Sequence, residues 1–266
     1  MRNNKIRIGI TQGDINGISY EIIIKALLDN RIYDMCTPVV YGSPKVAAYH
    51  RKALNIDNFS FNTIKTIEEA NPKRANIINC ISDSVRVELG KSTSMAGEAS
   101  YKALDTAVND LENNKIDAIV TGPINKYNIQ SDKFNFAGHT EYLESRFNPE
   151  GSLMLMVNEL FKMGVVTGHV PLAKVPELVT KESILKKIHI LNNSLITDFT
   201  MRKPRIAVLG LNPHAGDNGV IGDEEKKEII PAIKTARDDN INVFGPFPAD
   251  GFFGSNTFRK FDAAIA

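Results

Sequence analysis

The sequence lacks tryptophan, has only two cysteines in 266 residues, and has no excess of either charge. Lys and Arg number 32 against 31 for Asp and Glu, which leaves a formal net charge of +1. This balance gives no electrostatic attraction to nucleic acid or to a membrane surface, so we expect neither as a partner. Cys36 and Cys80 both adjoin apolar stretches, which favours reduced, buried thiols over a disulfide.

Long apolar runs are also missing. No segment is apolar over enough residues to cross a bilayer, and Ile6–Ile10 is too short for the core of a signal peptide. We therefore expect a cytoplasmic protein. The hydrophobic content of 42% is enough for a sizeable core, in one large domain or two smaller ones.

Short apolar, β-branched runs alternate with longer amphipathic stretches. The expected strands are Ile6–Ile10, Thr37–Tyr41, Ile77–Ile81, Asp117–Thr121, Leu153–Val157, Met163–Thr167, Ile206–Leu211, Val243–Phe247 and Asp262–Ala266. The expected helices are Tyr20–Leu28, Pro44–Leu54, Met95–Asn113, Ser183–Phe199 and one opened by the acidic run Asp223–Glu225. This alternation predicts an α/β fold with largely parallel sheets, and the adjacent strands near residue 160 predict an antiparallel addition. Polar residues cluster at 125–140, so we expect domains at 1–135 and 136–266.

Polar residues bracketed by Gly and Pro follow several expected strands, where α/β sheets bind ligands. His169 follows Met163–Thr167, and His214 follows Ile206–Leu211. Imidazole is the commonest metal ligand, so the two residues are either metal ligands or loop histidines bonded to backbone. A catalytic metal needs a third protein ligand, and the remaining histidines do not supply one convincingly.

Two further positions have both a functional and a structural interpretation. His139 and Thr140 lie where a glycine-led turn enters a helix, which suits either an anion site or a helix cap by Thr140. Asp250 follows a Pro-Phe-Pro segment and is either a rigidly placed base or metal partner, or a turn residue before Gly251. The loop Gly13–Gly17 is not a dinucleotide or phosphate-binding fingerprint.

Six short motifs, taken in order, resemble the 4-hydroxythreonine-4-phosphate dehydrogenase family over almost the whole chain. They are Gly13-Asp14-x-x-Gly17, Thr121-Gly122-Pro123-x-x-Lys126, Gly138-His139-Thr140-Glu141, Gly168-His169-x-Pro171-Leu172, Leu211-Asn212-Pro213-His214-Ala215-Gly216 and Gly245-Pro246-x-Pro248-Ala249-Asp250. The resemblance implies a two-domain fold of the isocitrate/isopropylmalate dehydrogenase type, and a homodimer with shared active sites in the interdomain clefts at the dimer interface.

The same resemblance implies a reaction and its residues. Such an enzyme uses a divalent metal (Zn, Mg or Co) and NAD or NADP to oxidise 4-phosphooxy-L-threonine. The β-keto acid formed loses CO2 to give 3-amino-2-oxopropyl phosphate, on the route to pyridoxal 5'-phosphate. His169 and His214 would be metal ligands, His139 and Thr140 would bind substrate, and Asp250 would be catalytic.

The chain departs from the family pattern in two ways. Ile15 and Asn16 stand where the family usually carries Pro-Ala, and Ser19 and Tyr20 stand where it carries Gly-Pro. The family's third metal-binding histidine and the return of the first domain are expected beyond Ala266, and the chain ends inside the apolar run Asp262–Ala266. We therefore expect this sequence to be truncated at its C-terminus.

Three alternatives follow from the same residues. The first is a dehydrogenase of a four-carbon sugar-acid phosphate, phosphothreonate or phosphoerythronate. The second is a metal-dependent hydrolase that uses the histidines to activate water. The third is a non-catalytic fragment that only binds ligand or packs as a dimer.

Overall fold

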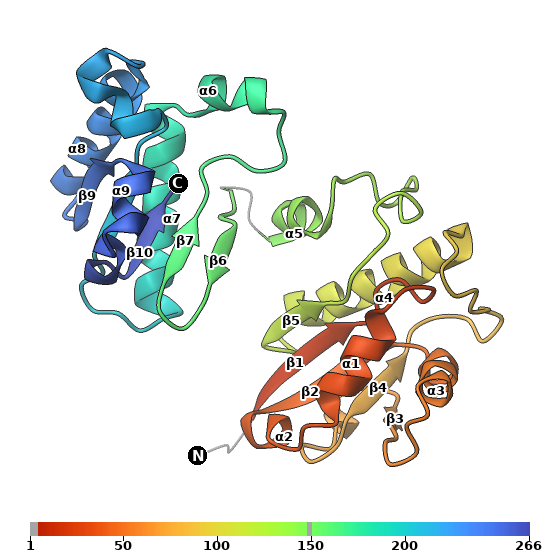
Figure 1. The fold of residues 1–266 in the computed structure, drawn as a ribbon. Helices are drawn as coiled ribbons and strands as arrows, with labels where there is room; N and C mark the ends of the chain where they lie inside the picture. The colour runs from red at the N-terminus through yellow and green to blue at the C-terminus, as the bar shows by residue number, and fades with distance from the viewer. Residues whose placement is uncertain (1–4, 148–150) are drawn as a thin grey trace. The chain divides into compact units, whose positions relative to one another are not determined.

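The chain folds into two compact units, Met1–Phe147 and Asn148–Ala266, in a computed structural model that describes residues 5–147 and 151–266 (Figure 1). We expected domains at 1–135 and 136–266, but the units divide between Phe147 and Asn148. The difference arises because helix α5 (His139–Phe147) packs on the first unit through Tyr142, which is buried in a cluster with Leu104 and Phe134.

The first unit is built on a parallel sheet of five strands in the order β3-β4-β2-β1-β5. The strands are β1 (Ile6–Thr11), β2 (Cys36–Gly42), β3 (Asn62–Ile64), β4 (Asn76–Asn79) and β5 (Ala118–Thr121). The sequence predicted four of them. It missed β3, whose three residues Asn-Thr-Ile contain no apolar run.

Helices cover both faces of this sheet. They are α1 (Ser19–Leu27), α2 (Ile32–Met35), α3 (Pro44–Ala53), the 3-10 turn η1 (Ile67–Glu69), α4 (Ser94–Glu112) and α5. Val40 and Ile77 pack with residues of α1 and α3, whereas Val39 and Tyr41 pack on the opposite face with Ala103 of α4. Because neighbouring β2 residues point to opposite faces, a continuous apolar strand is buried on both sides.

The second unit has a mixed sheet in the order β6-β7-β10-β8-β9. Its strands are β6 (Leu155–Val157), β7 (Lys162–Gly164), β8 (Ile206–Leu209), β9 (Val243–Phe247) and β10 (Ala263–Ile265). Strands β6 and β7 pair antiparallel, which confirms the predicted addition near residue 160, and the other pairs are parallel.

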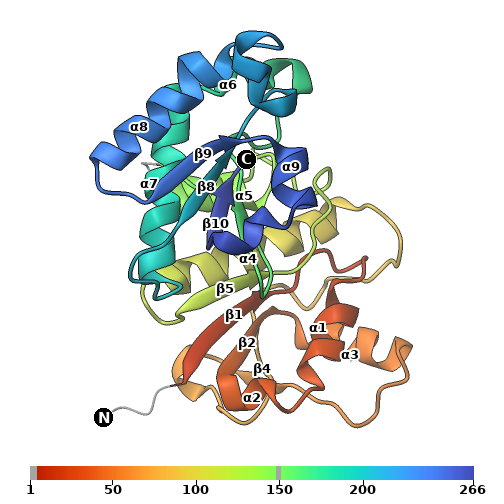
Figure 2. The same cartoon turned by 60° about the vertical axis from the view of Figure 1, so that its left-hand side comes forward.

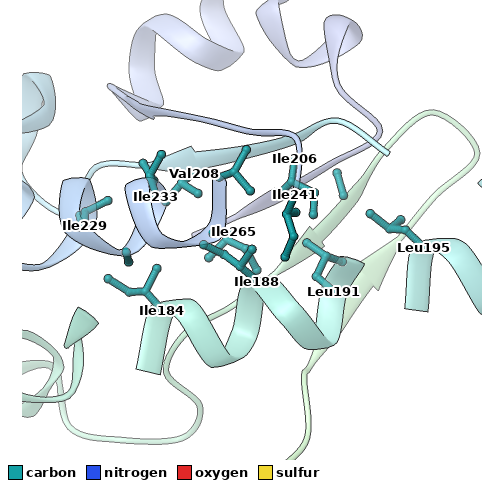
Figure 3. Close-up of a cluster of buried hydrophobic side chains, with 14 of the residues drawn as sticks. Ile184, Ile188, Leu191, Leu195, Ile206, Val208, Ile229, Ile233, Ile241 and Ile265 are labelled. Carbon is teal, nitrogen blue, oxygen red and sulfur yellow. The ribbon is translucent and has the colours of Figure 1, made fainter. Parts of the chain in front are cut away.

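Figure 2 shows α7 and α8 on one side of this sheet and α9 on the other. The helical elements are η2 (Leu172–Lys174), α6 (Val175–Leu178), α7 (Lys181–Thr197), η3 (Pro213–Gly219), the π-helix η4 (Glu225–Ile229), α8 (Ile230–Asp238), α9 (Ala249–Gly254) and η5 (Thr257–Lys260). An apolar stripe on α7, formed by Ile184, Ile188, Leu191 and Leu195, packs against the sheet (Figure 3). Within the described residues, no helix is both long and apolar enough to span a membrane.

Candidate functional site

Two predicted site residues meet beside the second sheet. His214 follows β8 and Asp250 follows β9, and these parallel strands end at the same edge. The Nδ1 atom of His214 lies 3.5 Å from Oδ2 of Asp250, and the two side chains are 68% and 66% exposed. This pair is therefore open to a ligand, and its imidazole and carboxylate are donors that suit a divalent cation.

His169 lies in an exposed loop between β7 and η2. Because β7 and β8 both run parallel to β10, the loops that carry His169 and His214 leave the same edge of the sheet. Across residues 5–147 and 151–266, the structure forms no cluster of three or more His, Cys, Asp or Glu side chains that could hold a metal. A metal site that joins His169 to His214 stays a prediction.

The turn that carries His214 has an unusual backbone. Five consecutive residues, from His214 to Asn218, have φ values of 54°, 54°, 78°, 41° and 55°. Left-handed helical conformation costs an L residue roughly 1–2 kcal/mol, so such a run persists only where surrounding contacts hold it. Strained backbone of this kind gathers at functional sites, which supports a role for His214 beyond that of a loop histidine.

A buried carboxylate lies under this turn. Glu225 is 3% exposed, and it accepts hydrogen bonds from the backbone N–H of Asn212 (2.7 Å) and from Nδ2 of Asn212 (2.9 Å). Burial opposes its charge most strongly, but the hydrogen bonds from Asn212 and from the nearby backbone together outweigh burial and hold the pKa of Glu225 below its usual range. The sequence predicted only an acidic helix start at Asp223–Glu225; a functional interpretation of Glu225 requires the fold.

A second group of site residues gathers at the N-terminus of α5. Nε2 of His139 is buried and has no hydrogen-bond partner among the residues that the structure describes. A Cβ atom on Gly138 would lie 3.5 Å from Cε of Lys126, so the lysine reaches the start of the helix. Burial, together with the charge of Lys126, lowers the pKa of His139. A lysine ammonium, helical N–H groups and a neutral imidazole together suit an anion.

The alternative of a helix cap by Thr140 does not fit this geometry, because α5 begins at His139 and Thr140 therefore lies inside the first turn. Lys126 belongs to the Gly-Pro-x-x-Lys motif, but sequence patterns assigned no role to this residue. Only the tertiary structure identifies Lys126 as a site residue, because its loop folds back onto Gly138.

The loop Gly13–Gly17 has a structural role. The side chain of Asn16 is 3% exposed; it donates to Lys91 O (2.9 Å) and accepts from Glu88 N (2.8 Å). The Oδ1 atom of Asp14 accepts from Asn16 N (2.9 Å) in a side-chain turn. Gly13 has φ +62°, and a Cβ there would lie 2.3 Å from Pro123 O, so only glycine fits.

Comparison with known proteins matches this chain to a family model and to named relatives. Residues 34–266 match the family model described as pyridoxal phosphate biosynthetic protein PdxA. A 4-hydroxythreonine-4-phosphate dehydrogenase of Bacteroides thetaiotaomicron is 48% identical over 100% of this chain and 73% of its own length. A putative D-threonate 4-phosphate dehydrogenase of Oceanobacillus iheyensis is 35% identical over 97% of this chain and 79% of its own length.

Solved structures agree with the sequence comparisons. The crystal structure of 4-hydroxythreonine-4-phosphate dehydrogenase from Klebsiella pneumoniae matches with a TM-score of 0.88 and 28% identity, covering 99% of this chain and 80% of that one. The enzyme of the same name from Burkholderia phymatum matches with a TM-score of 0.84 and 30% identity, covering 99% and 80%.

Proposed function

We propose that this chain, which belongs to the family of the pyridoxal phosphate biosynthetic protein PdxA, oxidises 4-phosphooxy-L-threonine with NAD or NADP. Membership makes it an oxidoreductase with a two-domain α/β fold of the family type, and not the hydrolase considered from the histidines alone. The product is a β-keto acid that loses CO2 to give 3-amino-2-oxopropyl phosphate.

The observation that carries this proposal is the pairing of His214 with Asp250 at 3.5 Å. A carboxylate beside one ring nitrogen orients an imidazole and leaves the other nitrogen for a metal. We assign His214 and His169 as ligands of a divalent cation, Zn2+, Mg2+ or Co2+, which also needs a third protein ligand. When bound, the cation supplies Lewis acidity that makes a substrate hydroxyl easier to deprotonate.

The remaining residues bind the substrate and move its proton. Asp250, exposed beside His214, accepts the proton of the hydroxyl as hydride leaves the same carbon for the nicotinamide. The anion site of the first unit holds the phosphate, with His139 and Thr140 at the helix start and Lys126 beside it. We further propose that the enzyme is a homodimer and works in the cytoplasm.

A second substrate is supported by a specific finding, since a relative of 35% identity is named a putative D-threonate 4-phosphate dehydrogenase. D-threonate 4-phosphate keeps the phosphate and the hydroxyl but replaces the amino group with a second hydroxyl. The metal and phosphate contacts assigned above serve both substrates, so only the group that meets the amino position separates them.

The test is NAD(P)H formation with each substrate, measured with and without divalent metal. His214→Ala should lower metal-dependent turnover by more than about 100-fold, beyond the 10–100-fold typical of residues that lie behind a metal ligand. The matched control is His189→Ala. His189 also pairs with an aspartate, since its Nε2 lies 3.0 Å from Oδ2 of Asp239, but it belongs to helix α7 and not to a loop at the candidate site. Full activity of His214→Ala would refute the assignment, and faster turnover of D-threonate 4-phosphate would establish the second substrate.

A further inference from the structure

The left-handed turn at His214 needs an anchor, because its backbone gives little stability of its own. Within it, Ala215 N donates to Asn212 O (3.0 Å), and Ile221 N donates to Gly216 O (3.1 Å). These bonds close the two ends of the turn but do not fix it to the sheet. A further contact must set where His214 points.

Glu225 makes that contact through Asn212, the residue at the start of the turn. Its Oε1 accepts from the backbone N–H of Asn212, and its Oε2 accepts from the side chain of Asn212. Both carboxylate oxygens therefore hold the residue that enters the turn. A π-helix starts at Glu225, and single π-helical turns are frequent at functional sites.

The turn also packs directly on this carboxylate. A Cβ on Gly216 would lie 2.6 Å from Oε2 of Glu225, and a Cβ on Gly210 would lie 3.2 Å from Oε1. Glycines at these two positions let backbone from both sides approach the carboxylate. Glu225 is thus enclosed by the end of β8 and by the turn, and its side chain is 3% exposed.

We propose that Glu225 is a positioning residue that, through Asn212, fixes the left-handed turn and so orients the His214 imidazole toward Asp250. The proposal rests on the proposed function for the meaning of that orientation, namely the presentation of a metal ligand. Glu225 touches neither metal nor substrate in this role. It acts on the backbone that carries His214.

The test compares Glu225→Gln and Asn212→Ala with wild type, using the whole chain. Glutamine keeps the shape but has one acceptor oxygen where the carboxylate has two, so one bond from Asn212 is lost. Asn212→Ala removes the side-chain donor and keeps its backbone N–H. The matched control is Glu182→Gln, an exposed glutamate in the first turn of α7.

Two measurements need neither metal nor substrate. Amide hydrogen exchange of the peptide 212–221 should become about 10-fold faster or more in Glu225→Gln, while the amides of α7 and α8 keep their protection. The His214 ring signal in NMR, assigned by its loss in His214→Ala, should move away from its wild-type position. Titration with Co2+ should then show affinity lowered by about 10–100-fold.

The proposal would be overturned if amide exchange of 212–221 and the His214 ring signal were unchanged in both variants. It would also be overturned if exchange became faster while the ring signal and the Co2+ affinity stayed as in wild type. If Glu225→Gln loses the protection of α7, it has not folded, and Asn212→Ala decides the question. If the wild-type chain binds no Co2+, the metal assignment fails, and the ring signal alone decides whether Glu225 positions His214.

Discussion

Arg146 should anchor helix α5, and its loss should weaken the first unit. Its guanidinium donates to Asp105 (3.0 Å), to Glu112 (2.6 and 2.8 Å), to Asn109 (2.8 Å) and to the hydroxyl of Tyr142 (2.7 Å). All but Tyr142 lie on α4, so one side chain ties the last turns of α5 to the longer helix. The change we consider is Arg146→Met, which keeps an apolar stem in place of the aliphatic part of the arginine and removes every donor.

The contribution of the Arg146 network to the free energy of unfolding follows from how exposed its side chains are. The Arg146 side chain is 25% exposed, and its carboxylate partners are 33–34% exposed. A hydrogen bond to a charged group contributes about 1.5–3 kcal/mol when buried, whereas exposed ion pairs contribute about 0–1 kcal/mol. With partial screening, the whole network should contribute about 2 kcal/mol to the free energy of unfolding of the first unit. The loss should be concentrated in α5, whose first turn carries His139.

Urea unfolding and amide exchange of α5 measure this loss. The matched control is Arg31→Met, because Arg31 pairs with Asp29 at 2.6 Å but is 87% exposed, and we expect no shift of its unfolding midpoint. In Arg146→Met, the KM for the phosphorylated substrate should also rise with little change in kcat, since α5 binds and does not react. Equal midpoint shifts in the two variants, or wild-type exchange of α5 in Arg146→Met, would refute this reasoning.

Two other perturbations probe the packing of the first unit. Gly97→Ala should destabilise this unit by about 1–3 kcal/mol, because the new Cβ would lie 1.8 Å from Asn128 O. Urea unfolding should show this loss. The control is Gly254→Ala, which should change stability little, because a Cβ there meets no described atom within 4 Å. Burial lowers the pKa of His50, despite the hydrogen bond of its ring to Ile15 O. As the pH falls below about 6.5, His50 therefore takes up a proton in the unfolded chain before it does so in the folded one, and the free energy of unfolding drops. Urea midpoints across pH 5–8 should show this drop, and His50→Gln should flatten it; an unchanged slope would contradict the buried neutral imidazole.

Sequence patterns predicted most of the fold because covered parallel strands need continuous apolar runs. Strand β9 has the predicted bounds Val243–Phe247, and β1 differs by one residue at its end. Strand β3 was not predictable in this way, since Asn62–Ile64 becomes a strand only through its pairing with β4. Tertiary pairing, and not local preference, makes such short strands.

The domain boundary also depends on tertiary packing that local sequence patterns do not reveal. Residues 125–140 are rich in polar side chains and therefore predicted the domain boundary, but the backbone there packs tightly on α4. Asn128 lies against Gly97, and Phe134 is fully buried. Polar composition marks loops, but it does not distinguish a linker from a loop that closes over its own domain.

The candidate site was predictable in part. Parallel strands end at one edge, so His169 and His214 were expected to converge there. Their convergence stays a prediction, but His214 lies close to Asp250, which follows β9. Glu225 was not predictable, because an acidic residue beside two others is usually a solvated helix start. Its burial depends on Asn212, which is thirteen residues away and joined to it by the fold.

The departures from the family pattern near the first strand have a structural explanation. The Tyr20 hydroxyl donates to Gln12 Oε1 (2.8 Å) and accepts from Ser43 N (2.9 Å), and Asn16 binds the segment before α4. Ser19 and Tyr20 are both 0% exposed. Oγ of Ser19 is buried without a hydrogen-bond partner among the described residues. The bonds of Asn16 and Tyr20 support the backbone of the loop from within, so these two changes are internal to it. They therefore do not count against the dehydrogenase chemistry, whose assigned residues His139, Thr140, His169, His214 and Asp250 all match the family motifs.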